Sequence, residues 1–565
     1  MSSVVHSAKR LRVPVLIAAM LVALVSLVPG PSATAKGTVN VQILATNDFH
    51  GNLQPPAGSS GRISLPGGGT VDAGGAEYLD THIAALEKTA EHTIVAAAGD
   101  IIGASPLLSA LFHDEPTIES MNLMGLDVAA VGNHEFDEGT VELLRMQDGG
   151  CHPTDGCQDG DGFAGADFQY LSANVVSETT GETLLPAVKV IKKGNVRIGF
   201  IGMTLEGTPS IVTPSGVAGY DFLDEADTAN HYADILRARG VETIVVLIHE
   251  GGVPTGFYNE CPGISGAIVD IVNRMESSID LVISGHTHQA YNCVINGKPV
   301  TSASSFGRLV TDIDLTIDKR SGNPVQIAVN NRIVTRNVAL DPGQTALISK
   351  YNAIAAPLAN RVIGSITADI TRTANSAGES ALGDVIADAQ FDATDDPGFG
   401  EAVVAFMNPG GIRADLTYAS SSAGEGDGNV TYGEAFTVQP FGNSLVTMTL
   451  TGAQIDAVLE QQFDNPAVGQ MRILQVSQGF TYTWDAAAPT GSKVSNIQIE
   501  GVPVDPGASY RVTVNSFLAD GGDNFTVLRN GINRLGGDVD TDALEKYFVA
   551  HSPVPPGPQN RITRV

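Results

Sequence analysis

The chain has 565 residues. This exceeds the ~250 to 300 residues at which a single hydrophobic core stops growing, so two domains are expected. Its 62 acidic and 32 basic residues give a net charge of −30, which argues against long nucleic-acid polymers as partners. Small phosphorylated ligands remain compatible with this charge, because a bound metal pair supplies positive charge locally.

The first element is an N-terminal export signal. Three basic residues precede an apolar run over residues 13–28, and the small-residue stretch Ala33-Thr34-Ala35 follows. This order is typical of a signal peptide, with an uncleaved membrane anchor as the alternative. The run is shorter than the ~20 apolar residues that span a bilayer, which favours cleavage. We therefore expect segment 1–35 to be removed, leaving a protein without a transmembrane anchor that is secreted or held in the cell envelope or periplasm.

Five short apolar runs between residues 38 and 316 each end in polar residues, and helix-like segments separate them. They read VQILATNDFHGN, TIVAAAGD, VAAVGNHEFD, TIVVLIHEGG and LVISGHTH. Buried strands joined by helical crossovers form an α/β fold, in which ligands gather at the carboxyl ends of the strands. The polar side chains at these ends are Asp48, His50, Asp100, Asn133, His134, Asp137, His249, His286 and His288.

These side chains favour a divalent metal centre, because mixed oxygen and imidazole ligands suit a borderline cation. Asp48 and His50 are separated by one residue, as are the two histidines of SGHTH. In extended backbone, each pair would project to the same side. Asp100 offers two carboxylate oxygens that are suited to bridging two cations. A single D-x-H pair is equally compatible with turn capping, but five such strand ends in one order are poorly explained by it.

The ordered set D-x-H, G-D, G-N-H-E-x-D, H and G-H-x-H resembles the calcineurin-like metallophosphoesterases, specifically the 5'-nucleotidase and UDP-sugar hydrolase family. The resemblance implies a four-layer α/β/β/α domain over residues 36–340 and two metal ions, zinc or manganese. One ion would be held by Asp48, His50, Asp100 and His288, and the other by Asp100, Asn133, His249 and His286. A metal-bound hydroxide would attack phosphorus. The catalytic group at the leaving oxygen would be His134, oriented by Asp137.

A helix is expected after this domain. Asp341-Pro342 is a helix start signal, and helical periodicity extends from about Gln344 to Asn360, which predicts an interdomain helix within residues 341–362. Three segments of residues 363–565, NPGGIR, VQPFGNSL and NSFLADGGDNF, resemble the family's smaller C-terminal α/β nucleotide-binding domain. The resemblance implies substrate binding by Asn408, Gly410, Gly411, Arg413, Phe441, Asn443, Phe517 and Asp523.

By the same resemblance, Phe441 and Phe517 sandwich a base and Asp523 binds the ribose hydroxyls, while core packing is the alternative for each phenylalanine. Stacking favours nucleotides without selecting a base, because every base has a π face. The chain lacks the arginine that the family often has just before the helix in GESALGDV, and has only Arg372 upstream. Recognition on the phosphate side therefore stays open.

The four cysteines suggest two disulfides, because their number is even and the chain is expected to be exported. Proximity favours Cys151 with Cys157 and Cys261 with Cys293. A zinc knot is the alternative, which the absence of C-x-x-C spacing disfavours. The aspartates of the segment 151–168 suggest a calcium loop, but the closing glutamate is missing, so a solvated disulfide loop is expected.

These features together predict an exported dimetal phosphohydrolase that dephosphorylates nucleoside 5'-monophosphates, with UDP-sugars and 2',3'-cyclic nucleotides as further candidate substrates. Two alternatives remain. A sulfur-ester hydrolase resembling SoxB has a similar dimetal domain but no need for a pair of aromatic rings. A non-catalytic nucleotide-binding surface protein would be expected to lack some of the metal ligands. The sequence does not define the oligomeric state.

Overall fold

The computed structural model describes residues 37–565, with gaps at 57, 213, 420–423 and 466–468. The segment expected to be a signal peptide, 1–35, therefore lies outside the described residues. Among the helices of the described part, none has the length and apolar character that crossing a membrane requires.

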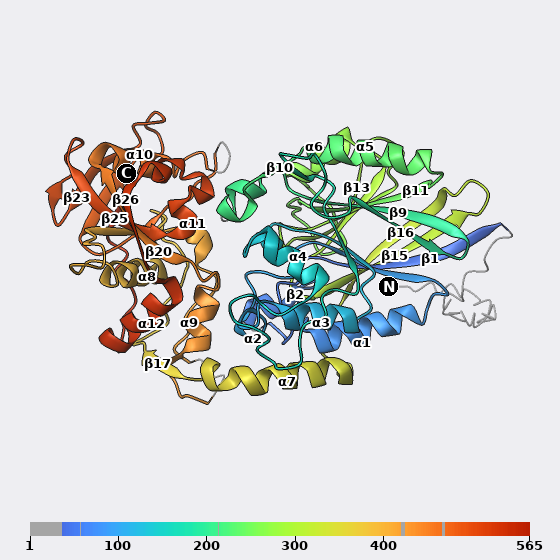
Figure 1. Cartoon of the computed structure of the whole chain (residues 1–565), viewed down its shortest axis with the longest axis horizontal. Helices are drawn as coiled ribbons and strands as arrows, with labels where there is room; N and C mark the ends of the chain where they lie inside the picture. Colours follow the sequence, from blue (N-terminus) through green and yellow to red (C-terminus); the bar gives the residue numbers. More distant parts are fainter. Residues whose placement is uncertain (1–36, 57, 213, 420–423, 466–468) are drawn as a thin grey trace, which may run out of the picture. The chain divides into compact units, whose positions relative to one another are not determined.

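Two six-stranded sheets form the first part of the chain (Figure 1). In spatial order, the first sheet contains β16 (Pro324–Ile333), β15 (Leu309–Asp318), β1 (Thr38–Thr46), β4 (Thr93–Ala98), β5 (Val128–Ala130) and β6 (Gln169–Leu171). The second contains β13 (Ala290–Ile295), β14 (Lys298–Ala303), β12 (Leu281–Ser284), β11 (Thr243–His249), β9 (Val196–Thr204) and β8 (Val188–Lys193). Two small antiparallel pairs accompany them, the hairpin of β2 (Arg62–Ser64) with β3 (Thr70–Asp72), and β7 (Val175–Ser177) with β10 (Tyr220–Phe222).

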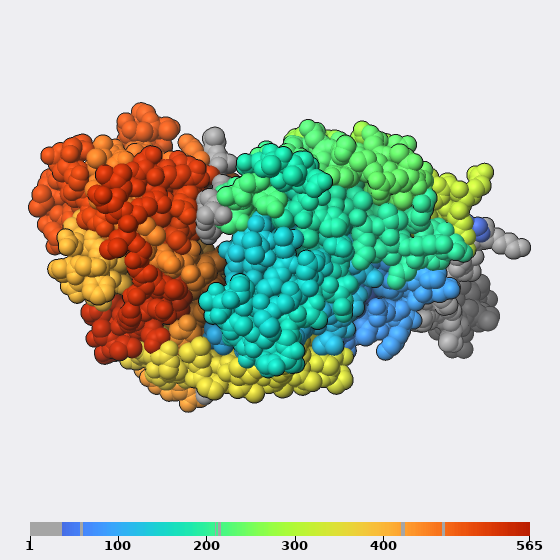
Figure 2. All heavy atoms as spheres, in the orientation of Figure 1, coloured from blue at the N-terminus to red at the C-terminus, as the bar shows by residue number. Residues whose placement is uncertain are grey.

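The two sheets pack face to face, because alternate side chains of their strands enter a shared core. Ile43 of β1 lies in one cluster with Phe200 of β9 and Val245 of β11, whereas Leu44 packs on the opposite face of the first sheet. That outer face is covered by α1 (Ala76–Glu87), α3 (Glu115–Leu123) and α4 (Thr140–Asp148), and the outer face of the second sheet by α5 (Glu225–Ala238) and α6 (Ala267–Arg274). In the space-filling view, blue and cyan segments, the colours of α1, α3 and α4, lie at this surface of the molecule (Figure 2). The predicted four-layer α/β/β/α arrangement is confirmed.

The second part of the chain contains a five-stranded sheet and a four-stranded sheet. In spatial order, the larger has β21 (Gln475–Val476), β18 (Val404–Met407), β25 (Ser509–Asn515), β20 (Ser444–Thr451) and β26 (Ile532–Val539), and the smaller has β24 (Val502–Pro503), β23 (Val494–Ile499), β22 (Phe480–Trp484) and β27 (Ile562–Arg564). A separate pair is β17 (Val362–Ser365) with β19 (Asn429–Thr431). The remaining helices are α2 (Leu107–Ala110), α7 (Pro342–Ala359), α8 (Ala381–Asp392), α9 (Tyr432–Val438), α10 (Gly452–Glu460), α11 (Ser516–Ala519) and α12 (Asp540–His551).

The start signal of α7 acts as the sequence predicts. The Asp341 side chain accepts hydrogen bonds from the backbone N–H groups of Gly343 and Gln344, which caps the helix. The helix ends at Ala359, within the predicted range 341–362.

The two predicted disulfides are present, Cys151–Cys157 and Cys261–Cys293, with Cα–Cα distances of 4.7 and 5.1 Å. Beside the first of them, Lys350 of α7 lies 2.7 Å from Asp159 and 3.0 Å from Asp161. One lysine therefore pairs with two of the loop's aspartates.

Candidate metal centre and substrate pocket

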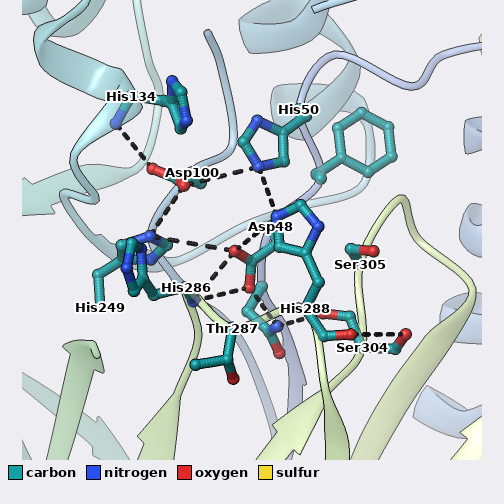
Figure 3. A network of polar contacts seen from close by, with 12 residues as sticks. Asp48, His50, Asp100, His134, His249, His286, Thr287, His288, Ser304 and Ser305 are labelled. Carbon is teal, nitrogen blue, oxygen red and sulfur yellow. Dashed lines mark hydrogen bonds and ion pairs between the residues drawn. The ribbon is translucent and has the colours of Figure 1, made fainter. Parts of the chain in front are cut away.

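The seven side chains expected to bind metal converge at the carboxyl ends of the strands (Figure 3). Ligand atoms of Asp48, His50 and His288 lie within 4.8 Å of one another, and so do those of Asp100, His249 and His286. Asn133 Oδ1 lies 3.0 Å from His286 Nδ1. Because β1, β4 and β5 are parallel in one sheet and β11 and β12 are parallel in the other, their ends deliver these residues to one place.

Five of the seven residues have left-handed backbone: φ is 49° at Asp48, 47° at His50, 48° at Asp100, 69° at His286 and 55° at His288. Residues with a Cβ pay ~1 to 3 kcal/mol each for such conformations, which cluster at functional sites. One sequence expectation is corrected here. Asp48 and His50 lie beyond the end of β1 at Thr46, so they converge through a tight loop and not through the alternation of an extended strand.

Hydrogen bonds orient two of the histidine rings. His249 Nδ1 lies 2.8 Å from the carbonyl oxygen of Ala98, and His50 Nδ1 lies 2.8 Å from that of Gly103. Each Nδ1–H therefore donates to a backbone carbonyl, so Nε2 is the nitrogen left for a metal. Burial opposes a charge on His249, but Asp100 and Asp48 raise its pKa to about 10, so a metal at its Nε2 would displace a proton. His50 Nε2 also lies 3.1 Å from His288 Nε2. Two ring nitrogens at this distance are arranged as ligands of one cation.

A buried atom without a hydrogen bond provides a test of whether these residues fit a metal. His249 Nε2 is buried and lies 2.8 Å from Asp100 Oδ2, but the two atoms are not aligned as a hydrogen bond. Buried polar atoms almost always have a partner, and a cation beside both atoms would supply it. Carboxylate, imidazole and amide donors together suit a borderline divalent cation. The residues therefore fit the metal pair that the sequence predicts.

The pKa shifts in the cluster differ from one side chain to the next. Burial lowers the pKa of His50 to about 3 and that of His286 to about 4, so both rings are neutral, the form that binds metals. Burial raises the pKa of Asp48. Burial by itself would raise the pKa of Asp100 too. The positive charges of His249 and His134 outweigh burial and hold the pKa of Asp100 well below its usual range. Asp100 is therefore the ionised carboxylate at the centre of the cluster.

His134 and Asp137 lie beside this cluster. The backbone N–H of His134 donates to Asp100 Oδ1 at 2.8 Å, and its ring Nδ1 lies 2.8 Å from Asp137 Oδ2. Burial opposes a charge on the ring, but Asp137 and Asp100 raise the pKa of His134 overall. A protonated imidazole with its Nδ1 held by a carboxylate has its other nitrogen free to donate to a substrate.

One cavity of about 300 Å³ is lined by every residue expected to bind substrate, together with Asn133, His134, Asp137 and His286. The ring of Phe441 stacks against that of His134, with centroids 5.9 Å apart, and the guanidinium of Arg413 lies 5.6 Å from the Phe441 ring centroid. The Phe517 ring contacts Gly522, where a Cβ would approach it to 2.5 Å. Two of the expected metal ligands, Asn133 and His286, therefore line the same space as the two phenylalanines.

The pocket also contains residues that the sequence patterns did not identify. Arg472 forms a very short ion pair with Asp523, which also accepts a 3.0 Å hydrogen bond from Asn408. Asn515 donates in turn to Asn408 Oδ1 at 2.9 Å. The sequence patterns gave neither residue a role, because Arg472 lies outside the three quoted segments and Asn515 is only the first residue of NSFLADGGDNF. Their positions in the pocket reveal them. The Asp523 carboxylate, expected at the ribose, is thus held in place from two sides.

A second cavity of about 900 Å³ adjoins the metal cluster and is lined by Arg308, Arg372 and Arg413. The three guanidinium groups have no carboxylate partner within ion-pair distance among the described residues. Arg372, the upstream arginine noted in the sequence, thus lies on the cavity wall. The surroundings of the metal cluster are therefore cationic, despite the net charge of −30.

Comparison with known proteins agrees with this geometry. Residues 41–290 match the family described as calcineurin-like phosphoesterase, and residues 362–530 match the 5'-nucleotidase C-terminal domain. The chain is 33% identical to the cell wall protein Lmo0130 of Listeria monocytogenes, over 94% of this chain and 70% of that protein. It is also 33% identical to endonuclease YhcR of Bacillus subtilis over 90% of this chain, but spans only 39% of the length of that relative.

The solved structure of a 5'-nucleotidase precursor from Thermus thermophilus is similar throughout. Its TM-score is 0.73 with 28% identity, over 93% of this chain and 99% of the other. Both matched domains occur here in the order that the strand-end motifs and the pocket residues predict. The chain therefore belongs to the 5'-nucleotidase family, whose members are metal-dependent phosphoester hydrolases with a calcineurin-like phosphoesterase domain followed by a 5'-nucleotidase C-terminal domain.

Proposed function

We propose that this protein is an exported phosphohydrolase that cleaves nucleoside 5'-monophosphates to nucleoside and phosphate. One observation carries the proposal. A single cavity of about 300 Å³ is lined by His134, Asn133 and His286 and also by Phe441 and Phe517. A nucleoside between the two rings would hold its 5'-phosphate toward the metal ligands, which is the placement that hydrolysis of a monophosphate requires.

We infer two divalent cations, zinc or manganese, bound as the sequence predicts. Asp48, His50, Asp100 and His288 would hold one, and Asp100, Asn133, His249 and His286 the other. When bound, two such cations activate a water at neutral pH and neutralise the phosphoryl oxygens. Asp100 is suited to the shared position, because its carboxylate is ionised and lies 2.8 Å from His249 and 3.5 Å from His50.

The residues of the chain then complete the reaction. A protonated His134 would donate to the ester oxygen as that oxygen gains negative charge, and Asp137 would hold the ring in the productive orientation. Arg413 would bind the phosphate side, since its guanidinium lines both cavities. Phe441 and Phe517 would bind the base, and Asp523, with Asn408 beside it, the ribose. Asn443, Gly410 and Gly411 line the same cavity and would shape its wall.

The proposed organisation has a signal peptide over 1–35, a dimetal domain over 36–340, a linker helix within 341–362 and a nucleotide-binding domain over 363–565. The matched family regions 41–290 and 362–530 support this division, because each falls almost entirely within one proposed domain. Export is supported by the signal-like N-terminus and by the similarity to a cell wall protein.

A second substrate class is favoured by the larger cavity. Its volume of about 900 Å³ and its three arginines provide room and positive charge beyond a single phosphoryl group. UDP-sugars and 2',3'-cyclic nucleotides are the candidates, since each carries its anionic group within a larger ester.

The test is hydrolysis of a panel of esters by the metal-reconstituted chain. Phosphate release is measured for AMP, UMP and ATP, glucose 1-phosphate for UDP-glucose, the 2'- or 3'-monophosphate for 2',3'-cyclic AMP, and p-nitrophenol for bis(p-nitrophenyl) phosphate. Wild type is compared with Asn133→Ala and Phe517→Ala. Metal-dependent release from AMP and UMP, abolished by Asn133→Ala and weakened through KM by Phe517→Ala, is expected. No release from any ester by protein that holds two metals would contradict the proposal, and would leave a sulfur-ester hydrolase or a nucleotide-binding protein as the function to test.

A further inference from the structure

Glu135, in the middle of the GNHEFD motif, is a buried carboxylate with only 2% of its surface exposed. Its two oxygens accept hydrogen bonds from the backbone. Oε2 accepts from the N–H of Asp100 at 2.9 Å and from that of Gly132 at 2.5 Å, and Oε1 accepts from the N–H of Ile101 at 2.8 Å. One side chain thus joins the loop after β4 to the loop after β5.

These N–H groups lie where the parallel ladder between β4 and β5 has ended, since the last paired residues are Ala98 and Ala130. Beyond that point the two loops no longer pair with each other, and their buried N–H groups need another acceptor. The Glu135 carboxyl group meets this need with four hydrogen bonds, the three above and a longer one of 3.5 Å from the N–H of Ile102 to Oε1. It therefore replaces the sheet ladder just where the metal ligands begin.

The loop that Glu135 holds is strained and tightly packed. Asp100 has a φ of 48°, and Glu135 binds both its N–H and the next one along the chain. A Cβ on Gly132 would come within 2.2 Å of Asp100 Oδ1, so the two loops are in direct contact. Asn133 follows Gly132 directly. The carboxylate of Glu135 therefore fixes the position of Asp100 relative to Asn133.

We propose that Glu135 is a positioning residue that sets the metal affinity of the centre, by holding Asp100 and Asn133 in the geometry of ligands without binding a metal itself. This inference rests on the proposed function in one respect, namely that Asp100 and Asn133 are metal ligands. Partners that orient the ligands of a metal typically change its affinity by ~10 to 100-fold when they are removed.

The test compares Glu135→Gln with wild type in the full chain. Glutamine has the same shape as glutamate but carries no charge, and its NH2 group would face N–H donors. At least one buried N–H therefore loses its acceptor. A matched control is Asp127→Asn. Asp127 Oδ2 accepts a 3.0 Å hydrogen bond from the N–H of Val95, near the opposite end of β4 and away from the metal ligands.

The readout is the dissociation constant of Mn²⁺, measured on the apoprotein by competition with a chromophoric chelator, together with the Tm of each apoprotein. Glu135→Gln is expected to weaken Mn²⁺ binding ~10 to 100-fold, and Asp127→Asn to leave it unchanged. Unchanged affinity in Glu135→Gln would overturn the proposal. An equal loss of affinity in both variants would overturn it too, because general destabilisation would then be the cause.

A second variant keeps the proposal testable if Glu135→Gln does not fold. Glu135→Asp retains the charge but shortens the side chain by one methylene group, so one carboxylate no longer reaches both loops. It is expected to weaken Mn²⁺ binding as well, and unchanged affinity would contradict the proposal. Failure of the proposed function would look different. Wild type would still bind Mn²⁺ more tightly than both Glu135 variants, but it would hydrolyse none of the esters tested.

Discussion

His134 is held by two carboxylates, because Asp137 Oδ2 lies 2.8 Å from its ring Nδ1 and its backbone N–H donates to Asp100 Oδ1 at 2.8 Å. The first contact orients the imidazole, and the second ties the backbone of the residue to the carboxylate at the centre of the metal cluster. The position of His134 relative to a bound phosphoryl group is therefore set by the same residue that is proposed to bridge the metals.

Replacement of His134 by alanine is expected to lower kcat for AMP by ~10² to 10⁴-fold, because a positioned general acid contributes that much. Asp137→Asn should lower kcat less, since the ring remains but loses its orientation. Steady-state kinetics with metal content measured in parallel would check this. Metal content equal to wild type is expected for both variants, and a loss of metal would assign His134 to the ligand set instead.

Removal of one ring of the proposed clamp is expected to weaken nucleotide binding. One base stack is worth ~1 to 3 kcal/mol, so Phe517→Ala should raise KM for AMP roughly 5 to 150-fold with little change in kcat. The control is p-nitrophenyl phosphate, which has no nucleoside and whose KM should change much less. Equal effects on both substrates would indicate that Phe517 packs in the domain and does not stack on a base.

Chelation of metal is expected to lower the Tm, because two buried carboxylates and four histidines would lose the cations between them. Mn²⁺ returned at 100 times its dissociation constant should stabilise the folded chain by about 2.7 kcal/mol per site. Differential scanning calorimetry with and without Mn²⁺ measures this. Asp100→Asn should show little of the shift, and a full shift in that variant would remove Asp100 from the ligand set.

The stability of the loop near the first disulfide should depend on pH through His113. Its Nδ1 lies 3.0 Å from Glu138 and its Nε2 2.8 Å from Asp155, and its ring stacks on His152 with centroids 3.7 Å apart. Burial disfavours the positive charge on His113. The hydrogen bond and charge of Glu138 and the hydrogen bond to Asp155 outweigh this effect and raise the pKa of His113 to about 9. In the unfolded chain, the pKa of a histidine is ~6.5.

Since the folded pKa is the higher one, the stabilisation by protonated His113 is complete below pH ~6.5 and is lost as the pH rises through about 9. The difference in urea-unfolding free energy between wild type and His113→Gln should therefore be largest near pH 6 and shrink toward pH 10. A difference that stays constant over this range would show that the carboxylates do not hold the proton on this ring.

Much of the metal centre could be predicted from the sequence, because the ligands follow apolar runs that only buried strands explain. The ends of parallel strands meet at one sheet edge, so the runs ending in Asp48, Asp100 and Asn133 imply proximity from the sequence alone. The disulfide pairs and the start of α7 at Asp341-Pro342 also follow from local patterns.

Tertiary structure decided what local patterns do not encode. One example is the left-handed backbone at Asp100. Others are the hydrogen bonds that Glu135 accepts from two separate loops, and the pairing of Arg472 with Asp523, which both join residues from different chain segments. Strain of this kind persists only when surrounding contacts hold it, and those contacts form when the chain is folded. The sequence by itself determined which side chains are available to bind metal and nucleotide, whereas packing alone set their conformations, their distances and the residues that hold them in place.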